Sequence, residues 1–473
     1  MSPSARDERL REEPAVLHER LREEPAALQP REAAEFVLSL AREHRLPDAD
    51  VLVQRDEQLN LRVNKGRIEK VEQCTCQGLG VRVVRDGRTG VAFTERLEPA
   101  ALEKAFRAAR ENADLQDATQ VVLADASPSA PDPEQLALYN PALDAVSVES
   151  LAAFALEAEA AASGADRRVS SVPHLAVSRD SGWYEVASTH GISYRQRFNS
   201  LGAHCQVLLE EGGQRKSGNA SWSRREWRPE AAQELGQLAT ARAAALFGAG
   251  PIPGGKLPVV LDEYCAPALL SMYFGAFSAE AAQKGQSRLK GRLGETIAVS
   301  GMTLMDEPHR VGAPGSRWVD AEGVTTRPLP LIDHGRFANF LYHIESARKE
   351  GKSSTGHAGR GYSSGITTRY HNLVVPAGPY SLDALTGLEP RCLLVTELEG
   401  GAGCNPLSGD ISIGVQGFLV EQGRRVQPVD SVTIAGNVYD LMQQIAALGK
   451  DYQPNLSRLF IPPILVHGLA LAG

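Results

Sequence analysis

The sequence has no long hydrophobic run and no apolar segment near its start. A membrane-spanning helix needs about 20 consecutive, mostly apolar residues, and no such run occurs. The opening residues MSPSARDERLREEP lack the hydrophobic core of a secretion signal. We therefore expect a cytoplasmic protein that has no membrane partner.

The chain is also not positively charged overall. The chain has 50 Lys and Arg residues against 58 Asp and Glu residues, which gives a formal net charge of −8. Nucleic-acid binding depends on concentrated Lys and Arg side chains that meet phosphates. We therefore expect no nucleic-acid partner.

Cysteine is scarce, with six residues in the whole chain. Cys74 and Cys76 form a CxC pair, whereas cysteine-rich zinc sites usually contain two CxxC pairs. Residues two apart on a strand point to the same face of a sheet, so both thiols are expected on one face. Free thiols in a reducing compartment are the default interpretation.

Several catalytic motifs are absent. The chain contains neither HExxH nor HExxxH, the patterns that place two zinc-binding histidines on one face of a helix. The only His followed by Glu is His18, and no second His lies four or five positions after it. GxSxG and the phosphate-binding P-loop pattern are missing as well, so serine-nucleophile chemistry and nucleotide binding have little support.

The length and the apolar content indicate a large folded protein. With 473 residues, of which 42% are hydrophobic, the chain can bury a substantial core and suggests two or more domains. Residues 1–30 form a charged N-terminal extension, in which LREEPAVL is followed by the near-repeat LREEPAAL. Pro14 and Pro25 predict two short helices there rather than one. We expect this extension to be solvated and partly ordered.

Residues 31–247 are predicted to form an N-terminal mixed α/β domain. Apolar residues recur at helical spacing in the segments 32–45, 99–113, 147–162 and 229–247. Alternating apolar residues predict strands at 50–54, 59–63, 80–84 and 89–93, and Asp86–Gly87 is a hairpin turn signal. Alternation continues over 172–209, where Gly182 and Gly191 are predicted turns.

Residues 256–473 are predicted to form a C-terminal β-rich domain with packed helices. Residues 248–255, rich in Gly and Pro, form the linker before it. A strand at 257–261 and helices at 266–277 and 438–448 are expected among short, glycine-bounded strands. The predicted fold class is therefore α+β with two domains.

Scattered histidines raise the possibility of a metal site. His334, His343, Glu345, His357 and His371 fall close together in the sequence, but their spacings match no known ligand pattern. Histidines at the surface, or held by hydrogen bonds, are the simpler interpretation. We therefore assign no metal ligand and no catalytic residue in this chain.

Segments rich in Gly and small polar side chains suggest a groove built largely of backbone. Glycine lets another main chain approach closely, and a strand edge beside such turns can receive an extended peptide. Tight turns of a β-rich domain explain the same pattern equally well. The groove candidates are Asp320, Glu322, Gly323, Thr355, Gly356, Asn372, Asn405, Ser408, Gly409 and Asp410.

Motifs spread over residues 33–473 resemble the TldD/PmbA (TldE) metallopeptidase family. Residues 400–437 look like the C-terminal signature of that family. Because HExxxH is missing, the chain resembles the PmbA/TldE branch, in which the metal ligands are lost. The other motifs are LRVNKGRIEKVE (61–72), GLGVRV (78–83), KGQS (284–287), GRLGE (291–295), TLMDEP (303–308), DAEG (320–323), STG (354–356), NPLSGD (405–410) and TIAGN (433–437).

The resemblance implies a two-domain subunit that assembles in pairs. It implies a non-catalytic chain that helps a TldD-like catalytic subunit form the substrate chamber of a cytoplasmic peptidase for unfolded peptides. Zinc is then expected in the TldD-like partner, with no cofactor in this chain. In TldD-like chains a helix after the strand corresponding to 257–261 carries the two histidines, and residues 264–277 here contain none.

Two other functions stay open at this point. One is a homodimeric peptide-binding or chaperone-like protein without hydrolytic activity. The other is a self-contained peptidase that uses atypical metal ligands among the histidines of 334–371. Some family members were labelled modulators of DNA gyrase, and the acidic balance gives no physical support for direct DNA contact.

Overall fold

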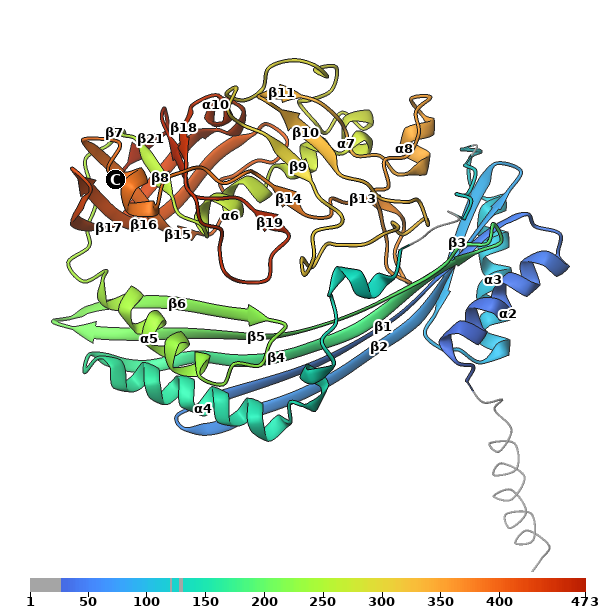
Figure 1. Ribbon diagram of the computed structural model, residues 1–473, viewed down its shortest axis with the longest axis horizontal. Coiled ribbons are helices and arrows are strands. Elements are labelled where there is room, and N and C mark those ends of the chain that lie inside the picture. The colour runs from blue at the N-terminus through green and yellow to red at the C-terminus, as the bar shows by residue number, and fades with distance from the viewer. Residues whose placement is uncertain (1–26, 120, 127–130) are drawn as a thin grey trace, which may run out of the picture.

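The computed structural model describes residues 27–119, 121–126 and 131–473 (Figure 1). The two short helices predicted near Pro14 and Pro25 lie outside the described residues. A curved sheet of long strands carries helices on its lower face in this view, and the C-terminal elements lie above it (Figure 1). Among the described residues, no helix combines the length and the hydropathy needed to cross a membrane.

The N-terminal half is built on a six-stranded antiparallel sheet in the order β3-β2-β1-β4-β5-β6. Two-residue turns at Lys65–Gly66 and Asp86–Gly87 have positive φ at both positions, as tight hairpins require. The strands are β1 (Asp48–Asn64), β2 (Arg67–Arg85), β3 (Arg88–Thr94), β4 (Val169–Ser188), β5 (Ser193–Glu211) and β6 (Gln214–Arg224).

Two sequence-based expectations for this sheet were wrong. The strands predicted at 50–54 and 59–63 are one continuous strand, β1. Gly182 lies inside β4 rather than in a turn, and a Cβ added there would come within 2.5 Å of the Arg55 carbonyl oxygen. Close packing of neighbouring strands therefore explains this glycine. The turn predicted at Gly191 is confirmed, with φ of +83°.

Four helices cover one face of the sheet, as the apolar periodicity predicts. They are α2 (Pro30–Glu43), α3 (Pro99–Asp114), α4 (Val148–Ala165) and α5 (Ala231–Ala244). Odd-numbered residues of β1 point into these helices: Val51 and Val53 pack with α2 and α3, and Leu61 packs with α4 and α5. Even-numbered residues of β1, such as Asp50, therefore face the C-terminal half. Two short 3₁₀ turns, η1 (Pro133–Leu136) and η2 (Pro141–Ala145), connect α3 to α4.

The C-terminal half contains an eight-stranded sheet, a five-stranded sheet and a two-stranded ribbon. Their orders are β18-β20-β8-β15-β16-β17-β21-β7, β11-β10-β9-β14-β19 and β12-β13. The strands are β7 (Gly255–Lys256), β8 (Val259–Leu261), β9 (Leu304–Asp306), β10 (Leu329–Asp333), β11 (Arg336–Phe337), β12 (Ala358–Gly359), β13 (Thr367–Thr368), β14 (Leu373–Val374), β15 (Arg391–Glu399), β16 (Asp410–Glu421), β17 (Arg424–Asn437), β18 (Ile445–Leu448), β19 (Leu459–Phe460), β20 (Ile464–Val466) and β21 (Ala470–Ala472).

Short helices pack on these sheets, and two of them differ from the prediction. They are α6 (Cys265–Ser271), η3 (Phe274–Phe277), α7 (Ala279–Gln283), α8 (Ile344–Arg348), α9 (Leu382–Thr386) and α10 (Val438–Met442). The helix predicted at 266–277 is divided into α6 and η3. The helix predicted at 438–448 ends at Met442, because residues 445–448 instead pair with β20 as strand β18. The α+β class is confirmed, while the domain boundaries stay a prediction.

Candidate functional site

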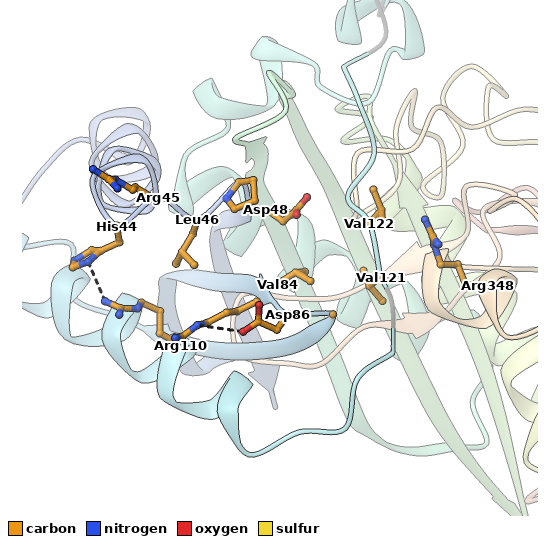
Figure 2. Close-up of a pocket in the computed structure, with 13 residues that line it drawn as sticks. His44, Arg45, Leu46, Asp48, Val84, Asp86, Arg110, Val121, Val122 and Arg348 are labelled. Carbon is orange, nitrogen blue, oxygen red and sulfur yellow. Dashed lines mark hydrogen bonds and ion pairs between the residues drawn. The ribbon is translucent and has the colours of Figure 1, made fainter.

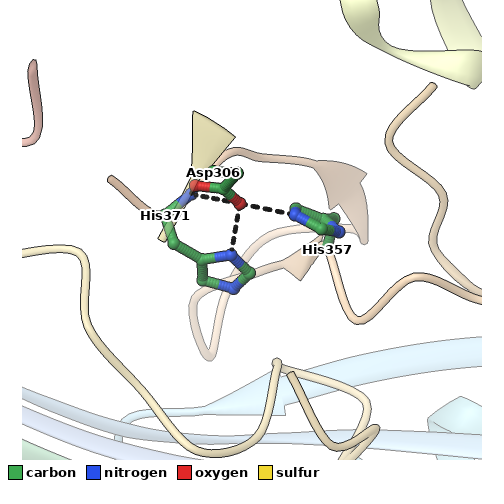
Figure 3. Close-up of side chains that lie close together, drawn as sticks. All are labelled: Asp306, His357 and His371. Carbon is green, nitrogen blue, oxygen red and sulfur yellow. Dashed lines mark hydrogen bonds and ion pairs between the residues drawn. The ribbon is translucent and has the colours of Figure 1, made fainter. Parts of the chain in front are cut away.

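A buried cluster of Asp306, His357 and His371 joins three segments of the C-terminal half (Figure 3). Asp306 ends β9, His357 directly precedes β12, and His371 lies just before β14. One oxygen of Asp306, Oδ2, lies 2.5 Å from His357 Nε2 and 2.8 Å from His371 Nδ1. The other oxygen, Oδ1, accepts the backbone N–H groups of His371 and Asn372 at 3.0 and 2.8 Å.

The electrostatics of the cluster favour an ionised Asp306 carboxylate beside the two histidine rings. Burial alone would raise the pKa of Asp306, but the neighbouring His371 and His357 rings outweigh it and hold that pKa well below its usual range. Burial lowers the pKa of His371 to about 4. Each ring has one nitrogen within hydrogen-bond distance of the carboxylate, and an N–H donated from each ring would satisfy the buried charge.

The same three side chains also form a candidate metal site. One ligand atom from each residue lies within 4.8 Å of the other two, and two histidines with one carboxylate are a common donor set for zinc. Ligands bound at about 2.0–2.1 Å around one zinc ion lie roughly 3.3 Å apart. The 2.5 and 2.8 Å separations here are shorter. The distances therefore match hydrogen bonds between Asp306 and the two rings. To bind a metal ion, both rings would have to move away from Asp306.

Three groove candidates support this cluster instead of lining an open groove. Thr355 Oγ1 lies 2.8 Å from His357 Nδ1, which fixes the second nitrogen of that ring. Asn372 is fully buried, and its side chain bonds to Gly315, Glu307 and Ser316. Gly356 has φ of +78°, a conformation that favours glycine. These residues hold the loops around the histidines in place.

Three further candidates, Asp320, Glu322 and Gly323, belong to one turn of the C-terminal half, and Glu322 joins this turn to Arg82 of the long sheet. Asp320 accepts backbone N–H groups of Glu322, Val324 and Ala358 at 2.9–3.0 Å. Glu322 accepts hydrogen bonds from the Arg82 guanidinium and from the Ile344 N–H. Both carboxylates are almost completely buried, so neither side chain is presented to a ligand in this structure.

The remaining candidates form a separate loop at 405–410. Asn405 Oδ1 accepts the N–H groups of Leu407 and Ser408 at 2.9 and 3.3 Å, an ordinary turn for this residue type. Asn437 Nδ2 bonds to the Ser408 carbonyl and to Asp410, each at 3.0 Å. Gly409 has φ of +82° at the end of this turn. No hydrogen bond or ion pair between described residues joins this loop to the histidine cluster. The structure thus separates the predicted groove residues into three groups.

The helix α6 follows β8, the position at which the family resemblance led us to expect the zinc-binding helix of a TldD-like chain. Its residues are Cys-Ala-Pro-Ala-Leu-Leu-Ser, without His, Asp or Glu. Cys265 is buried, and burial with the nearby Asp262 raises the pKa of its thiol. Asp262 Oδ1 instead accepts the N–H groups of Tyr264 and Cys265 at the start of the helix, at 3.0 and 2.8 Å. This segment cannot bind zinc in the expected way.

A pocket of about 720 Å³ lies away from the cluster, at the β2–β3 turn beside α2 and α3 (Figure 2). Its lining is rich in arginine, but part of that charge is already engaged within the protein. Arg110 Nη1 lies 3.2 Å from His44 Nδ1, and Arg85 lies 3.8 Å from Asp86. None of the groove candidates lines this pocket. We therefore derive no ligand site from it.

Sequence reasoning missed Asp306, Arg82 and Asp50. Asp306 stands within the TLMDEP motif, and only that motif drew attention to it. Arg82 and Asp50 sit in the strands predicted at 80–84 and 50–54, and both are nearly fully buried. No local pattern indicates that a second part of the chain covers this stretch of the sheet.

Comparisons with protein-family models match most of the chain. The model of PmbA/TldA metallopeptidase domain 1 matches residues 49–113, and the central-domain model matches residues 141–247. The model of the C-terminal domain of the PmbA/TldA metallopeptidases matches residues 254–473.

Individual proteins match over nearly their full length. Metalloprotease PmbA of Escherichia coli O157:H7 is 28% identical over 445 residues, which cover 93% of this chain and 96% of that protein. A metalloprotease TldD homolog of Haemophilus influenzae is 26% identical over 432 residues, covering 87% of this chain and 88% of that protein.

Solved structures of similar proteins also match nearly the whole chain. A Thermotoga maritima protein described as a modulator of a DNA gyrase has a TM-score of 0.85 and 27% identity, covering 93% of this chain and 100% of that chain. TldE from Thermococcus kodakarensis has a TM-score of 0.82 and 25% identity, with the same coverage.

Proposed function

The chain belongs to the PmbA/TldD metallopeptidase family, and from this premise we propose that it is a non-catalytic, TldE/PmbA-like subunit. In this proposal a TldD-like partner supplies the zinc ion and the hydrolytic residues. The present chain completes the substrate chamber for unfolded peptides. The complex acts in the cytoplasm.

The main support for this proposal is that α6 contains no His, Asp or Glu. A zinc peptidase of the HExxxH type needs two histidines on one helical face and a glutamate beside the bound water. The helix that follows β8 has none of these residues. Asp262, one of the two carboxylates just before this helix, already accepts backbone N–H groups of Tyr264 and Cys265. Hydrolysis by the expected route therefore needs ligands from another chain.

Co-expression provides the test. The chain is produced alone and together with an HExxxH-bearing homologue, and both preparations are assayed on casein-derived peptides. We expect the two chains to co-purify, and we expect hydrolysis that a chelator stops only in the joint preparation. A partner carrying Gln in place of the motif Glu is the matched control, and it should remove activity while the complex still forms. A lone chain that digests peptides and stops with a chelator would contradict the proposal.

The buried cluster favours one second candidate, a self-contained metal-dependent peptidase. Asp306, His357 and His371 bring three ligand atoms within 4.8 Å of one another. Metal analysis of the isolated chain separates the two candidates. Stoichiometric zinc that disappears in both His357→Ala and His371→Ala would support the second candidate, and His334→Ala is the control because that side chain is 81% exposed. Saturable peptide binding without cleavage, alone and with any partner, would instead favour a chaperone-like homodimer.

A further inference from the structure

Three arginines of the C-terminal half have no acidic partner. They are Arg317, which lies between β9 and β10, Arg369, which follows β13, and Arg458, which precedes β19. In the part of the chain that the structure describes, their side chains form no ion pair and no hydrogen bond. The buried Arg82, by contrast, bonds to two carboxylates. We call residues 317, 369 and 458 the arginine cluster.

The charges of these three side chains act on one another. Burial lowers the pKa of the Arg458 guanidinium, and the neighbouring Arg317 and Arg369 lower it further. A lowered pKa of an arginine means that its charged form is less favourable there than in water. Cations that are partly buried together are stabilised when an anion joins them. The arginine cluster therefore carries positive charge that its own fold does not neutralise.

Two carboxylates near the arginine cluster are committed to other partners. Asp306 acts on the Tyr370 hydroxyl together with Arg458, but its oxygens already contact two histidine rings and two backbone N–H groups. Asp320 acts on the hydroxyl of Tyr184, but it accepts three backbone N–H groups. Among the described residues, neither carboxylate forms an ion pair with the cluster.

Backbone contacts fix where two of these side chains begin. The N–H of Arg369 donates to the His357 carbonyl at 2.9 Å, and the carbonyl of Arg458 accepts the N–H of Leu373 at 2.8 Å. The stem of Arg369 crosses Gly359, where an added Cβ would lie 2.4 Å from the Arg369 Cδ. The absence of a side chain at Gly359 thus makes room for this arginine. The cluster is held by the same loops that hold the histidines.

The long sheet contributes Tyr184 of β4 to the same place. Tyr184 lies directly opposite Gln54 of β1, on the face that meets the C-terminal half. Its ring centroid is 5.4 Å from Cζ of Arg317. The Tyr184 hydroxyl and the Arg317 Nε are both buried, and neither has a hydrogen-bond partner. Buried polar atoms in folded proteins nearly always have one, so both atoms keep unused hydrogen-bonding capacity beside the unpaired charges.

We propose that the arginine cluster binds a carboxylate, and that this carboxylate is the free C-terminus of a peptide. A guanidinium group can hold a carboxylate through two parallel N–H···O bonds. The rings of Tyr184 and Tyr370 lie beside Arg458 and offer apolar surface to the last side chain of a peptide, which inorganic phosphate would not use. The proposal rests on the proposed function, because it names the end of the peptide substrate that this chain holds.

Peptide binding to the isolated chain tests the proposal. A flexible peptide without Asp or Glu is labelled with rhodamine at its N-terminus and made with a free C-terminus or with a C-terminal amide. Fluorescence anisotropy measures both affinities. We expect the free carboxylate to bind about ten-fold more tightly or better, as charge-assisted hydrogen bonds allow. Equal affinities would overturn the proposal. Inorganic phosphate is the third ligand, and cluster-dependent binding of phosphate with equal peptide affinities would assign the site to a free anion instead.

Two arginine variants connect the preference for a carboxylate to the cluster. Arg458→Gln and Arg369→Gln should each reduce the affinity for the free-carboxylate peptide about ten-fold and leave the amide unchanged. Arg369 is exposed, so its variant keeps the test valid if the half-buried Arg458 is needed for folding. Arg391→Gln is the matched control, because Arg391 is 52% exposed on β15, and it should bind as the wild type does. An unchanged carboxylate preference in both cluster variants would overturn the proposal.

Thermal unfolding of the same variants separates binding from a structural role. Without peptide, Arg458→Gln should be at least as stable as the wild type, because it removes one of three cations that repel one another. A weaker preference for the carboxylate that merely accompanied a large loss of stability in both cluster variants would contradict the proposal. These measurements need no TldD-like partner. Their failure would therefore leave the co-purification test of the proposed function unaffected.

Discussion

The guanidinium of Arg360 donates a 2.6 Å hydrogen bond to the carboxylate of Asp50, across 310 positions of the sequence. Asp50 lies on β1, and Arg360 directly follows β12, so this contact joins the long sheet to the C-terminal half. Arg82 bonds to the other Asp50 oxygen and also to Glu322. These four side chains are at most 5% exposed, and their charges cancel.

Removing Arg82 should destabilise the protein strongly. Arg82→Met leaves Asp50 with one partner and Glu322 without its cation, and breaking a buried charge pair costs about 3–5 kcal/mol. Chemical denaturation measures the change in unfolding free energy. Arg62→Met is the control, because the Arg62–Glu69 pair is 42% and 46% exposed and should contribute less than about 1 kcal/mol. Similar losses in both variants would contradict this account of the network.

Asp320 should make the protein less stable as the pH rises toward neutrality. Burial, together with the neighbouring Glu322 carboxylate, raises the pKa of Asp320 to about 7, whereas an unfolded Asp titrates near about 3.9. The folded state therefore holds the proton more tightly. The resulting stabilisation is complete below the unfolded pKa and is lost as the pH passes through the folded pKa.

Comparison with Asp320→Asn isolates this contribution. Unfolding free energies are measured by urea titration at several pH values between 4 and 8. Stability should decline more steeply with rising pH in the wild type than in the variant, which has no proton to lose at this position. Identical slopes in the two proteins would show that Asp320 does not titrate in this range.

Replacing Asp306 should unfold the loops around the histidine cluster. Asp306→Ala leaves two ring N–H groups and two backbone N–H groups without an acceptor. A buried donor that loses its partner costs about 1–3 kcal/mol, so the total loss should exceed about 3 kcal/mol. Thermal and chemical unfolding measure it. Asp333→Ala is the control, since that side chain is 60% exposed, and its effect should be within about 0.5 kcal/mol.

Two glycines in the α4–α5 pair should respond in opposite directions to alanine. At Gly236 of α5, a Cβ would lie 2.3 Å from the Ala158 carbonyl oxygen of α4, so Gly236→Ala forces the helices apart. Overpacking of this kind costs about 1–3 kcal/mol. At Gly164 of α4, a Cβ meets nothing within 4 Å, so Gly164→Ala should stabilise the protein by about 0.5–1 kcal/mol. The same change in unfolding free energy for both variants would contradict the packing described.

Much of the N-terminal half could be predicted because its elements depend on local patterns. The helix at 99–113 and the Asp86–Gly87 hairpin both follow from residues within a few positions of one another. Gly182 was misread because a glycine inside a strand has the same local appearance as a turn. Glycine is needed at this position because the Arg55 backbone of the neighbouring strand leaves no room for a Cβ. Arg55 lies far away in the sequence.

The candidate site depended on contacts that no local pattern encodes. His357 and His371 were considered as possible metal ligands on sequence grounds, but their common partner Asp306 lies more than 50 positions earlier. The helix predicted at 438–448 failed for a related reason. Pairing between β18 and β20 overrides the helical spacing of residues 445–448.

The pairing of β1 with β4 also limits how this protein can be divided. The two strands run side by side from Asp50 opposite Ser188 to Val63 opposite Leu175, so the first and second matched family segments share one hydrogen-bonded ladder. A recombinant fragment that stops near residue 120 would contain β1 without its neighbour β4. The complementary fragment would contain β4 without β1, so each would expose unpaired backbone hydrogen-bonding groups. Such pieces should aggregate when made apart.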